Sequence, residues 1–438
     1  MSAGLIMLAT GKLALAMVLL APPVAAAAQA EDTATTRLDV TLDRSDWRYN
    51  LGDTARFRVS FSRSGRTIAG SRAIVEIGAE RMKPIRTDTL RFSTGAQVLK
   101  ATRSDAGFLR ANATAMIDSA TYRGMATAAF SPETITPVTT MPADFEEFWA
   151  RTIEAARQVP LKPVMTRLPK WSNPAVDVYH VSFQNDRERS RLYGMLSVPT
   201  RPGKLPAILV VPGAGVRPYF PDTAMARLGV IHLRLGIHGI PVDRDSLLYS
   251  ELRATALDGY WKFGIESRDT YYYKRVFAGV VRAGDFIFSL PRFDGANYVV
   301  QGGSQGGALA IVAGALDKRV KAISANHPAL SDHFAYFSGR PGGWPHIFAD
   351  TSGMRALPEK EETLRYYDTV NFARLLTVPG IYTWGYNDNT VPPTSAYAFY
   401  NLIRAPKELI IAPEAGHFTV PAQDKRTRQW LLAKLGIN

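Results

Sequence analysis

The sequence contains no cysteine among its 438 residues. This absence excludes disulfides, thiol nucleophiles and thiolate metal ligands together. The fold must therefore depend on an apolar core, and 46% hydrophobic residues are enough to build one. A chain of this length exceeds one ordinary domain, so we expect two.

Long apolar runs are also scarce. One run, residues 13–20, follows Lys12 and precedes the Ala-x-Ala pattern at residues 28–30, which is typical of an export signal. We therefore expect residues 1–30 to be a signal peptide cleaved after Ala30 and the mature protein to be periplasmic; the alternative is a retained N-terminal anchor. No later run approaches a membrane span in length, so no transmembrane segment is expected after cleavage.

The chain lacks clusters of basic charge, although its net charge is +13 and falls to about +12 once Lys12 leaves with the signal. Lysines and arginines are scattered, with no basic block and no basic-aromatic stripe. This pattern favours a solvated surface and excludes a nucleic-acid partner from our expectations. Attraction to an acidic polymer or an anionic cell surface stays open.

The first part of the mature chain, residues 31–132, has no histidine. Apolar and polar residues alternate over residues 38–42, 57–61 and 109–115, and turn signals separate these runs. The pattern predicts a small antiparallel β-sandwich of immunoglobulin-like type. Because it holds no catalytic set, we expect a binding or assembly module, followed by a proline- and threonine-rich linker over residues 133–141.

The pattern of the remaining residues, 142–438, predicts an α/β domain. A helix is expected to open at Pro142, a hairpin over residues 176–198, and a longer helix over residues 270–290. Short apolar strands alternate with helical stretches after the hairpin, which predicts a mostly parallel sheet with helices on both faces. The expected strands are residues 207–211, 231–234, 298–300, 322–325, 380–384 and 408–412.

One motif stands between a strand and a helix of this domain. Gly302, Ser304 and Gly306 fit the Gly-x-Ser-x-Gly nucleophile elbow, in which a strained turn exposes the serine hydroxyl. Such a serine needs a base, and the base needs an acid to orient it. Four of the seven histidines follow Ser304: His327, His333, His346 and His417.

Position along the chain selects the partners. In folds with this elbow the order is serine, acid, histidine, with each partner after a strand. His417 follows the last expected strand, and Asp388 follows the strand before it. Glu414 is a rival acid, but it lies too close to His417 to come from a separate strand end. The backbone N–H groups of Gln305 and Ala214 are the candidate oxyanion donors.

The sequence does not indicate a cofactor. His232 and His238 lie six residues apart without carboxylates at ligand spacing, so we expect no metal site. Arg234 is expected to fix loops by hydrogen bonds, and His238 is a candidate for lining the pocket. The aromatic residues Trp261 and Tyr271 to Tyr273 could stack on a sugar, although packing is the simpler role.

Several of these segments resemble one family. The run Gly303-Ser-Gln-Gly-Gly307, the helix starting at Tyr272, the run Asp388 to Pro393 and the run Pro142 to Trp149 are similar to the acetyl xylan esterase and cephalosporin C deacetylase family, carbohydrate esterase family seven. The resemblance covers residue 140 to the end. It implies an α/β-hydrolase fold, no cofactor or metal, Ser304 as nucleophile, His417 as base, Asp388 as acid, and Gln305 and Ala214 as oxyanion donors.

Two motifs depart from the family. It usually carries Arg-Gly-Gln where this chain has Arg234-Leu-Gly236, and His-Glu where this chain has His417-Phe418. Short family members also lack the N-terminal β domain and assemble as rings, so homo-oligomer formation stays open here.

The resulting hypothesis is a serine carboxylesterase that removes acetyl groups from acetylated xylan, xylo-oligosaccharides or other small esters through an acetyl-enzyme. Two alternatives remain. One is a serine peptidase of prolyl-oligopeptidase type, although about a hundred residues of sandwich cannot build the propeller of that class. The other is an inert carbohydrate-binding protein.

Overall fold

The computed structural model describes residues 35–350 and 358–437, so the predicted signal peptide lies outside the described residues. Residues Thr36–Asn438 form one compact unit. The boundaries predicted between sandwich, linker and catalytic domain therefore stay predictions, although the strands and α-helices fall on either side of them.

The N-terminal part consists of two sheets. In one sheet, β1 and β3 pair antiparallel and β4 and β7 pair with β3; in the other, the order is β2-β9-β8-β5-β6. The strands are β1 Thr36–Leu42, β2 Arg48–Tyr49, β3 Ala55–Arg63, β4 Arg66–Thr67, β5 Arg72–Gly78, β6 Arg86–Arg91, β7 Gln97–Ala101, β8 Gly107–Ile117 and β9 Ala120–Phe130.

The two sheets pack through the side chains that alternate inward along each strand, including Phe57 and Val59 of β3 and Ala113 of β8, all fully or almost fully buried. The predicted antiparallel arrangement holds with one exception, because β2 runs parallel to β9. The chain passes from β1 in one sheet to β2 in the other, and a crossover of this kind permits a parallel pair where a hairpin does not.

The C-terminal part is built on a mixed sheet with the order β10-β11-β12-β14-β13-β15-β16-β17-β18. The strands from β14 and β13 to β18 are parallel to one another, while β10, β11 and β12 form the antiparallel edge. The strands are β10 Val164–Arg167, β11 Val176–Gln184, β12 Arg191–Pro199, β13 Leu205–Val211, β14 Ile231–Gly236, β15 Phe293–Gly303, β16 Ala322–Asn326, β17 Gly380–Trp384 and β18 Lys407–Ile411.

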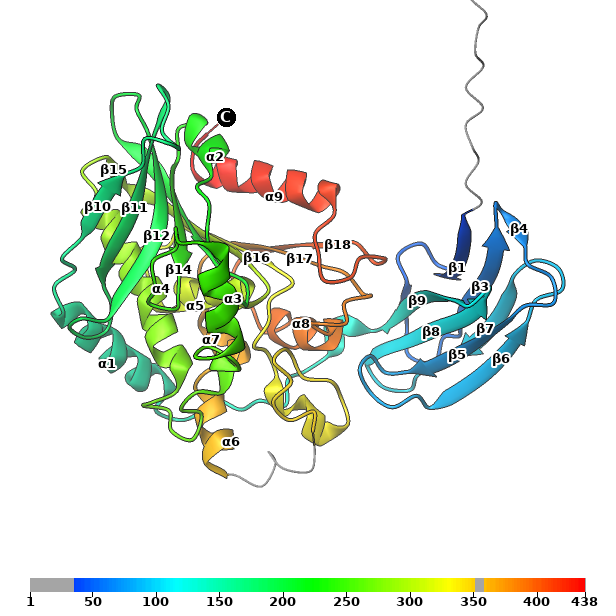
Figure 1. Ribbon diagram of the computed structural model, residues 1–438. Helices are drawn as coiled ribbons and strands as arrows, with labels where there is room; N and C mark the ends of the chain where they lie inside the picture. Colours follow the sequence, from blue (N-terminus) through cyan, green and yellow to red (C-terminus); the bar gives the residue numbers. More distant parts are fainter. Residues whose placement is uncertain (1–34, 351–357, 438) are drawn as a thin grey trace, which may run out of the picture. The chain divides into compact units, whose positions relative to one another are not determined.

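Helices cover both faces of this sheet (Figure 1). Helices α2 and α9 lie on one face, and α1, α4, α5, α7 and α8 lie on the other. The α-helices are α1 Phe145–Gln158, α2 Thr223–Arg227, α3 Ser246–Ala254, α4 Tyr272–Ser289, α5 Gln305–Leu316, α6 Pro358–Arg365, α7 Thr369–Leu375, α8 Pro393–Tyr400 and α9 Pro421–Lys434; short 3₁₀ turns occupy Pro132–Thr134, Tyr260–Lys262 and His333–Ser338.

The predicted α/β-hydrolase fold is confirmed and each expected strand is present, although β15 begins at Phe293 and ends at Gly303 instead of covering only residues 298–300. The first helix was misplaced: it begins at Phe145, with Asp144 at its N-cap, instead of at Pro142. Strand β10 was missed because its side chains are all exposed, which removes the alternation that marks a half-buried strand.

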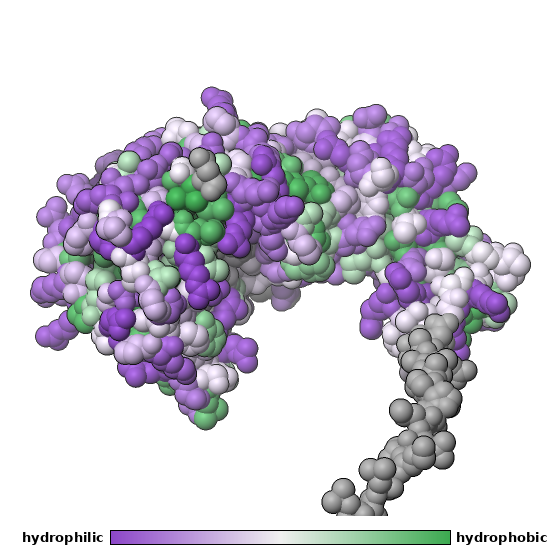
Figure 2. All heavy atoms as spheres, turned by 90° about the horizontal axis from the view of Figure 1, so that it is seen from above, coloured by the Kyte–Doolittle hydropathy of each residue, from purple (hydrophilic) through white to green (hydrophobic). Residues whose placement is uncertain are grey.

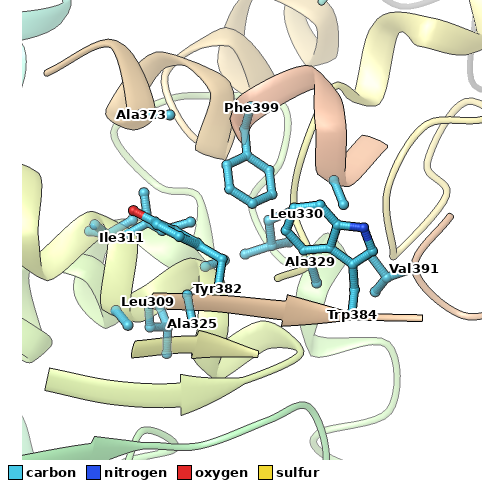
Figure 3. Packing of buried hydrophobic residues seen from close by; sticks show 14 of the residues in the cluster. Leu309, Ile311, Ala325, Ala329, Leu330, Ala373, Tyr382, Trp384, Val391 and Phe399 are labelled. Carbon is cyan, nitrogen blue, oxygen red and sulfur yellow. The ribbon is translucent and has the colours of Figure 1, made fainter. Parts of the chain in front are cut away.

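Aromatic packing fixes the last parallel strands. Tyr382 and Trp384 of β17 point toward Phe399 of α8 (Figure 3), with ring centroids 6.2 and 6.3 Å from that of Phe399. Val391 lies beside Trp384 in the same cluster and is almost fully buried. Both ends of the loop that follows β17 are therefore anchored in the core.

The surface seen from the side of α2 and α9 is mostly hydrophilic, with small, separate hydrophobic patches (Figure 2). No helix within residues 35–350 and 358–437 is both long and apolar enough to cross a membrane.

Candidate active site

Ser304 lies at the sharp turn between β15 and α5. Its backbone has φ 59° and ψ −125°, a strained combination for a residue with a Cβ atom. The turn is closed by two glycines: a Cβ atom on Gly302 would lie 2.2 Å from the carbonyl oxygen of Gly306, and one on Gly306 would lie 2.4 Å from that of Val211. The motif therefore needs glycine at both positions for steric reasons.

His417 lies in the loop after β18 and faces the elbow. Its Nε2 is 2.9 Å from Ser304 Oγ, and its Nδ1 is 2.7 Å from Asp388 Oδ2. The structure thus brings together three side chains that are 113 and 29 residues apart in sequence. They meet because β15, β17 and β18 are parallel and end at the same edge of the sheet.

The carboxylate of Asp388 is fully buried and bonded at both oxygens. Oδ1 accepts from the backbone N–H groups of Thr390 and Val391 at 2.7 and 2.8 Å, and Oδ2 faces His417. An ionised carboxylate only accepts hydrogen bonds, so the imidazole must present its proton at Nδ1. This tautomer leaves Nε2 free to accept from the Ser304 hydroxyl.

His327, at the end of β16, forms a wall of the site that sequence reasoning considered only as a rival base. Its ring centroid lies 4.5 Å from that of His417. Burial, and to a lesser extent the neighbouring His417, lowers the pKa of His327 to about 4, so its ring is neutral near pH 7. The sequence could have indicated that His327 lies at the site, because it directly follows a predicted parallel strand.

The two candidate oxyanion donors belong to two segments near Ser304. Gln305 is the first residue of α5, where an N–H has no partner inside the helix. Ala214 follows β13 and lines the same cavity as Ser304, and a Cβ atom on its neighbour Gly213 would lie 3.7 Å from the Cβ of Ser304. Their positions are compatible with a shared oxyanion pocket.

The side chain of Gln305 connects these two segments. Its Oε1 accepts from the hydroxyls of Tyr260 and Tyr273, both at 2.7 Å, and its Nε2 donates to the carbonyl oxygen of Pro212 at 3.3 Å. The carboxamide is fully buried. It therefore fixes the start of α5 against the loop that carries Ala214.

His238 also contacts the loop that carries Ala214. It is buried, with Nε2 3.1 Å from the carbonyl oxygen of Gly215 and Nδ1 2.7 Å from the hydroxyl of Tyr272. Tyr271, Tyr272 and Tyr273 are almost fully buried, which gives these residues the packing role instead of a sugar-stacking one.

Arg234 donates to the carbonyl oxygen of Phe220 at 3.3 Å, as expected for a residue that fixes loops. His232 is buried 3.8 Å from Asp222, and burial lowers its pKa to about 4. No group of three or more His, Asp or Glu side chains in the described part of the chain is arranged to hold a metal ion. Glu414, the rival acid, has an exposed side chain.

A cavity of about 830 Å³ opens over Ser304 and His417. It is bounded by residues of β13, β14, β15 and β16 and by the aromatic side chains of Tyr219, Phe220 and Trp344. Phe220 is 56% exposed and packs against the exposed Trp171, with ring centroids 5.9 Å apart. An apolar, aromatic rim beside a polar floor suits a small organic substrate.

Comparison with known proteins gives consistent results. The family model described as acetyl xylan esterase matches residues 132–434. Acetyl esterase Axe7A of Xylanibacter ruminicola is 39% identical over 396 residues, which are 89% of this chain and 88% of that protein.

Two solved structures are also similar. The acetyl xylan esterase from Paenibacillus sp. R4 is 25% identical and superimposes with a TM-score of 0.61, covering 69% of this chain and 98% of its own. Acetyl xylan esterase 1 from Thermoanaerobacterium sp. JW/SL YS485 is 21% identical with the same TM-score, covering 69% and 97%, and supports the fold alone.

Proposed function

Because this chain belongs to the acetyl xylan esterase family and is a carboxylic ester hydrolase, we propose that it removes acetyl groups from acetylated xylan or xylo-oligosaccharides, with Ser304 as nucleophile. The observation that carries the proposal is the continuous hydrogen-bonded chain from Asp388 through His417 to Ser304. This arrangement can activate an alcohol that is otherwise a weak nucleophile.

In the first half of the reaction, Ser304 Oγ attacks the acetyl carbonyl carbon and His417 Nε2 takes the hydroxyl proton. Asp388 stabilises the imidazolium that forms. The carbonyl oxygen becomes an oxyanion, which accepts hydrogen bonds from the N–H groups of Gln305 and Ala214. One such donor contributes on the order of a hundredfold in rate.

The tetrahedral intermediate then breaks its bond to the sugar oxygen. His417 returns the proton to that oxygen, the sugar alcohol leaves, and an acetyl group remains on Ser304. In the second half, His417 takes a proton from water, which attacks the acetyl carbon and releases acetate while Ser304 regains its proton.

The carbohydrate substrate is supported by two observations. The relative that matches most of the chain is named an acetyl esterase, and the solved relative at 25% identity is named an acetyl xylan esterase. The cavity rim also presents Phe220 and Trp344, whose flat faces suit the apolar face of a sugar ring.

The deciding experiment measures acetate release from acetylated xylan, acetylated xylo-oligosaccharides, cephalosporin C and 4-nitrophenyl acetate. We expect Ser304→Ala to abolish hydrolysis of each ester that the wild type cleaves. Ser324→Ala, at a buried serine in the neighbouring strand β16, is the matched control and should keep wild-type rates. Full activity of Ser304→Ala on 4-nitrophenyl acetate would end the proposal.

Two further assays separate the other functions considered. A peptidase would hydrolyse aminoacyl 4-nitroanilides, and an inert binding protein would release no acetate and would not react with a fluorophosphonate probe.

We also propose that the protein acts in the periplasm after cleavage following Ala30. Mass spectrometry of the secreted or periplasmic form should show an N-terminus at Glu31.

A further inference from the structure

The loop that carries Asp388 contacts side chains of the N-terminal sheets. Arg110, in β8, donates from Nη2 to the carbonyl oxygens of Tyr386 and Asp388, at 2.7 and 3.1 Å. Its Nη1 bonds the side-chain oxygen of Asn389. Arg110 is 276 residues from Tyr386 in sequence and only 2% exposed.

Two further side chains extend this contact. Arg110 Nε donates to Thr127 Oγ1 at 2.8 Å, and the Thr127 hydroxyl donates to Asn387 Oδ1 at 2.9 Å. Arg81 donates to the carbonyl oxygen of Asn389 at 2.6 Å. We call Arg81, Arg110 and Thr127 the brace. Together they bond each residue of the loop from Tyr386 to Asn389.

The bonded groups show what the brace does. The Asp388 carboxylate faces inward to His417, Thr390 and Val391. The carbonyl oxygens of Tyr386 and Asp388 instead face Arg110 in the N-terminal sheets. Trp384 and Val391 lie in the core before and after the acid (Figure 3). The brace bonds the backbone between these anchors.

Asn387 connects the N-terminal sheets to the loop that carries His417. Its Nδ2 donates to the carbonyl oxygens of Met125 in β9 and of Glu414, both at 3.3 Å, and its N–H donates to that of Ala415 at 3.1 Å. Glu414 and Ala415 belong to the loop that ends at His417. One side chain therefore joins the N-terminal sheets to the loops of both the acid and the base.

Two residues of the brace, Arg110 and Thr127, are buried, and Arg110 carries a charge. Burial lowers the pKa of the Arg110 guanidinium from its ordinary value, and the negative charges of Glu80 and Asp388 oppose that shift. An arginine stays protonated in proteins, so a buried positive charge faces the loop. Glu80 is 1% exposed and accepts from the backbone N–H of Thr394 at 3.0 Å, which adds a second contact beside the first turn of α8.

We propose that the N-terminal sheets are a working part of the active site and that Arg110 is a positioning residue for the Asp388–His417 hydrogen bond. This inference rests on the proposed function, because it assigns Arg110 a role in the reaction of Ser304. The family match begins at residue 132, so the brace lies outside it. The sheets that the sequence suggested as a binding or assembly module thus have a role in catalysis.

The test compares Arg110→Met, which removes the charge and all donors, with Arg110→Lys, which keeps the charge but has three N–H donors where the planar guanidinium bonds four acceptors. Arg103→Met is the matched control, since the Arg103 guanidinium bonds Asp105 and Phe108 within the N-terminal sheets. Thermal melting of each full-length variant checks that it is folded.

With 4-nitrophenyl acetate we expect kcat to fall roughly 10- to 100-fold in Arg110→Met, with KM within about twofold, because a small misplacement of a catalytic group costs rate more than binding. Arg110→Lys should show most of this loss, and it keeps the test available if Arg110→Met does not fold. Arg103→Met should keep the wild-type kcat.

A double-mutant cycle separates positioning from general loosening. In an Asp388→Asn background, either Arg110 substitution should lower kcat by less than about twofold, since the group it positions has already been removed. Wild-type kcat in folded Arg110→Met or Arg110→Lys, or an equal loss in both backgrounds, would overturn the inference. Retained activity in Ser304→Ala would instead overturn the proposed function, so the two failures are distinct.

Discussion

Replacing Asp388 by asparagine removes one charge and keeps the shape of the side chain, and the surrounding hydrogen bonds determine how the new amide is oriented. The N–H groups of Thr390 and Val391 need an acceptor, at 2.7 and 2.8 Å from the present Oδ1. The amide oxygen must therefore occupy that position, and the amide NH₂ must face His417 Nδ1.

An NH₂ group only donates hydrogen bonds, so His417 must present an unprotonated Nδ1 and carry its proton on Nε2. In this tautomer the imidazole cannot accept the Ser304 proton at 2.9 Å. For triads of this kind the wrong tautomer lowers kcat about 10⁴-fold, which corresponds to about 5 kcal/mol in the activation barrier. Because the backbone bonds survive, the melting temperature should change little.

The assay is kcat and KM on 4-nitrophenyl acetate, together with the rate of fluorophosphonate labelling at Ser304. We expect both rates to fall by about the same factor, because both require the activated hydroxyl. Glu414→Gln, at the exposed rival acid, serves as the control and should behave as wild type. If Asp388→Asn keeps a tenth or more of the wild-type kcat, or if Glu414→Gln loses activity, the assignment of the acid is wrong.

Three other outcomes are expected. Gly306→Ala places a Cβ atom 2.4 Å from the Val211 carbonyl oxygen and should lower the free energy of unfolding by about 2 kcal/mol in urea melts. Burial raises the pKa of Asp332 from 3.8 to about 6, so folding favours its protonated form. The free energy of unfolding of the wild type should therefore fall as the pH rises from about 4 to 6, and it should fall less in Asp332→Asn. Phe220→Ala should raise KM about 2- to 10-fold for acetylated xylo-oligosaccharides and leave KM for 4-nitrophenyl acetate unchanged. Trp171→Ala removes the ring that packs against Phe220 and should raise KM for the xylo-oligosaccharides by less.

The positions of the candidate triad could be predicted from the sequence because each rests on local patterns. Ser304 lies in a short motif whose glycines are required sterically, and Asp388 and His417 each follow an apolar strand. Parallel strands end at one edge of the sheet, so strand order alone brings these loops together. The catalytic roles stay part of the proposal until the variants are measured.

Other features of the site depend on neighbours that the sequence does not reveal. His238 was a candidate for lining the pocket, but its contacts with Gly215 and Tyr272 give it a supporting role. Gln305 was chosen for its backbone N–H, whereas its side chain also ties α5 to the loop after β13. Both roles depend on which side chains from other elements reach the same point.

The sequence by itself determined the fold class, the elbow and the order of its partners, because hydrophobic periodicity and turn chemistry act over a few residues. Only the tertiary structure decided the role of Arg110. Arg110 lies between the core residues Leu109 and Ala111 in β8, so the two-residue period predicts that its side chain faces solvent. The side chain is nevertheless buried, because a loop 276 residues away covers that face of the strand. A period of two identifies the two faces of a strand, but only the folded chain shows what lies against each.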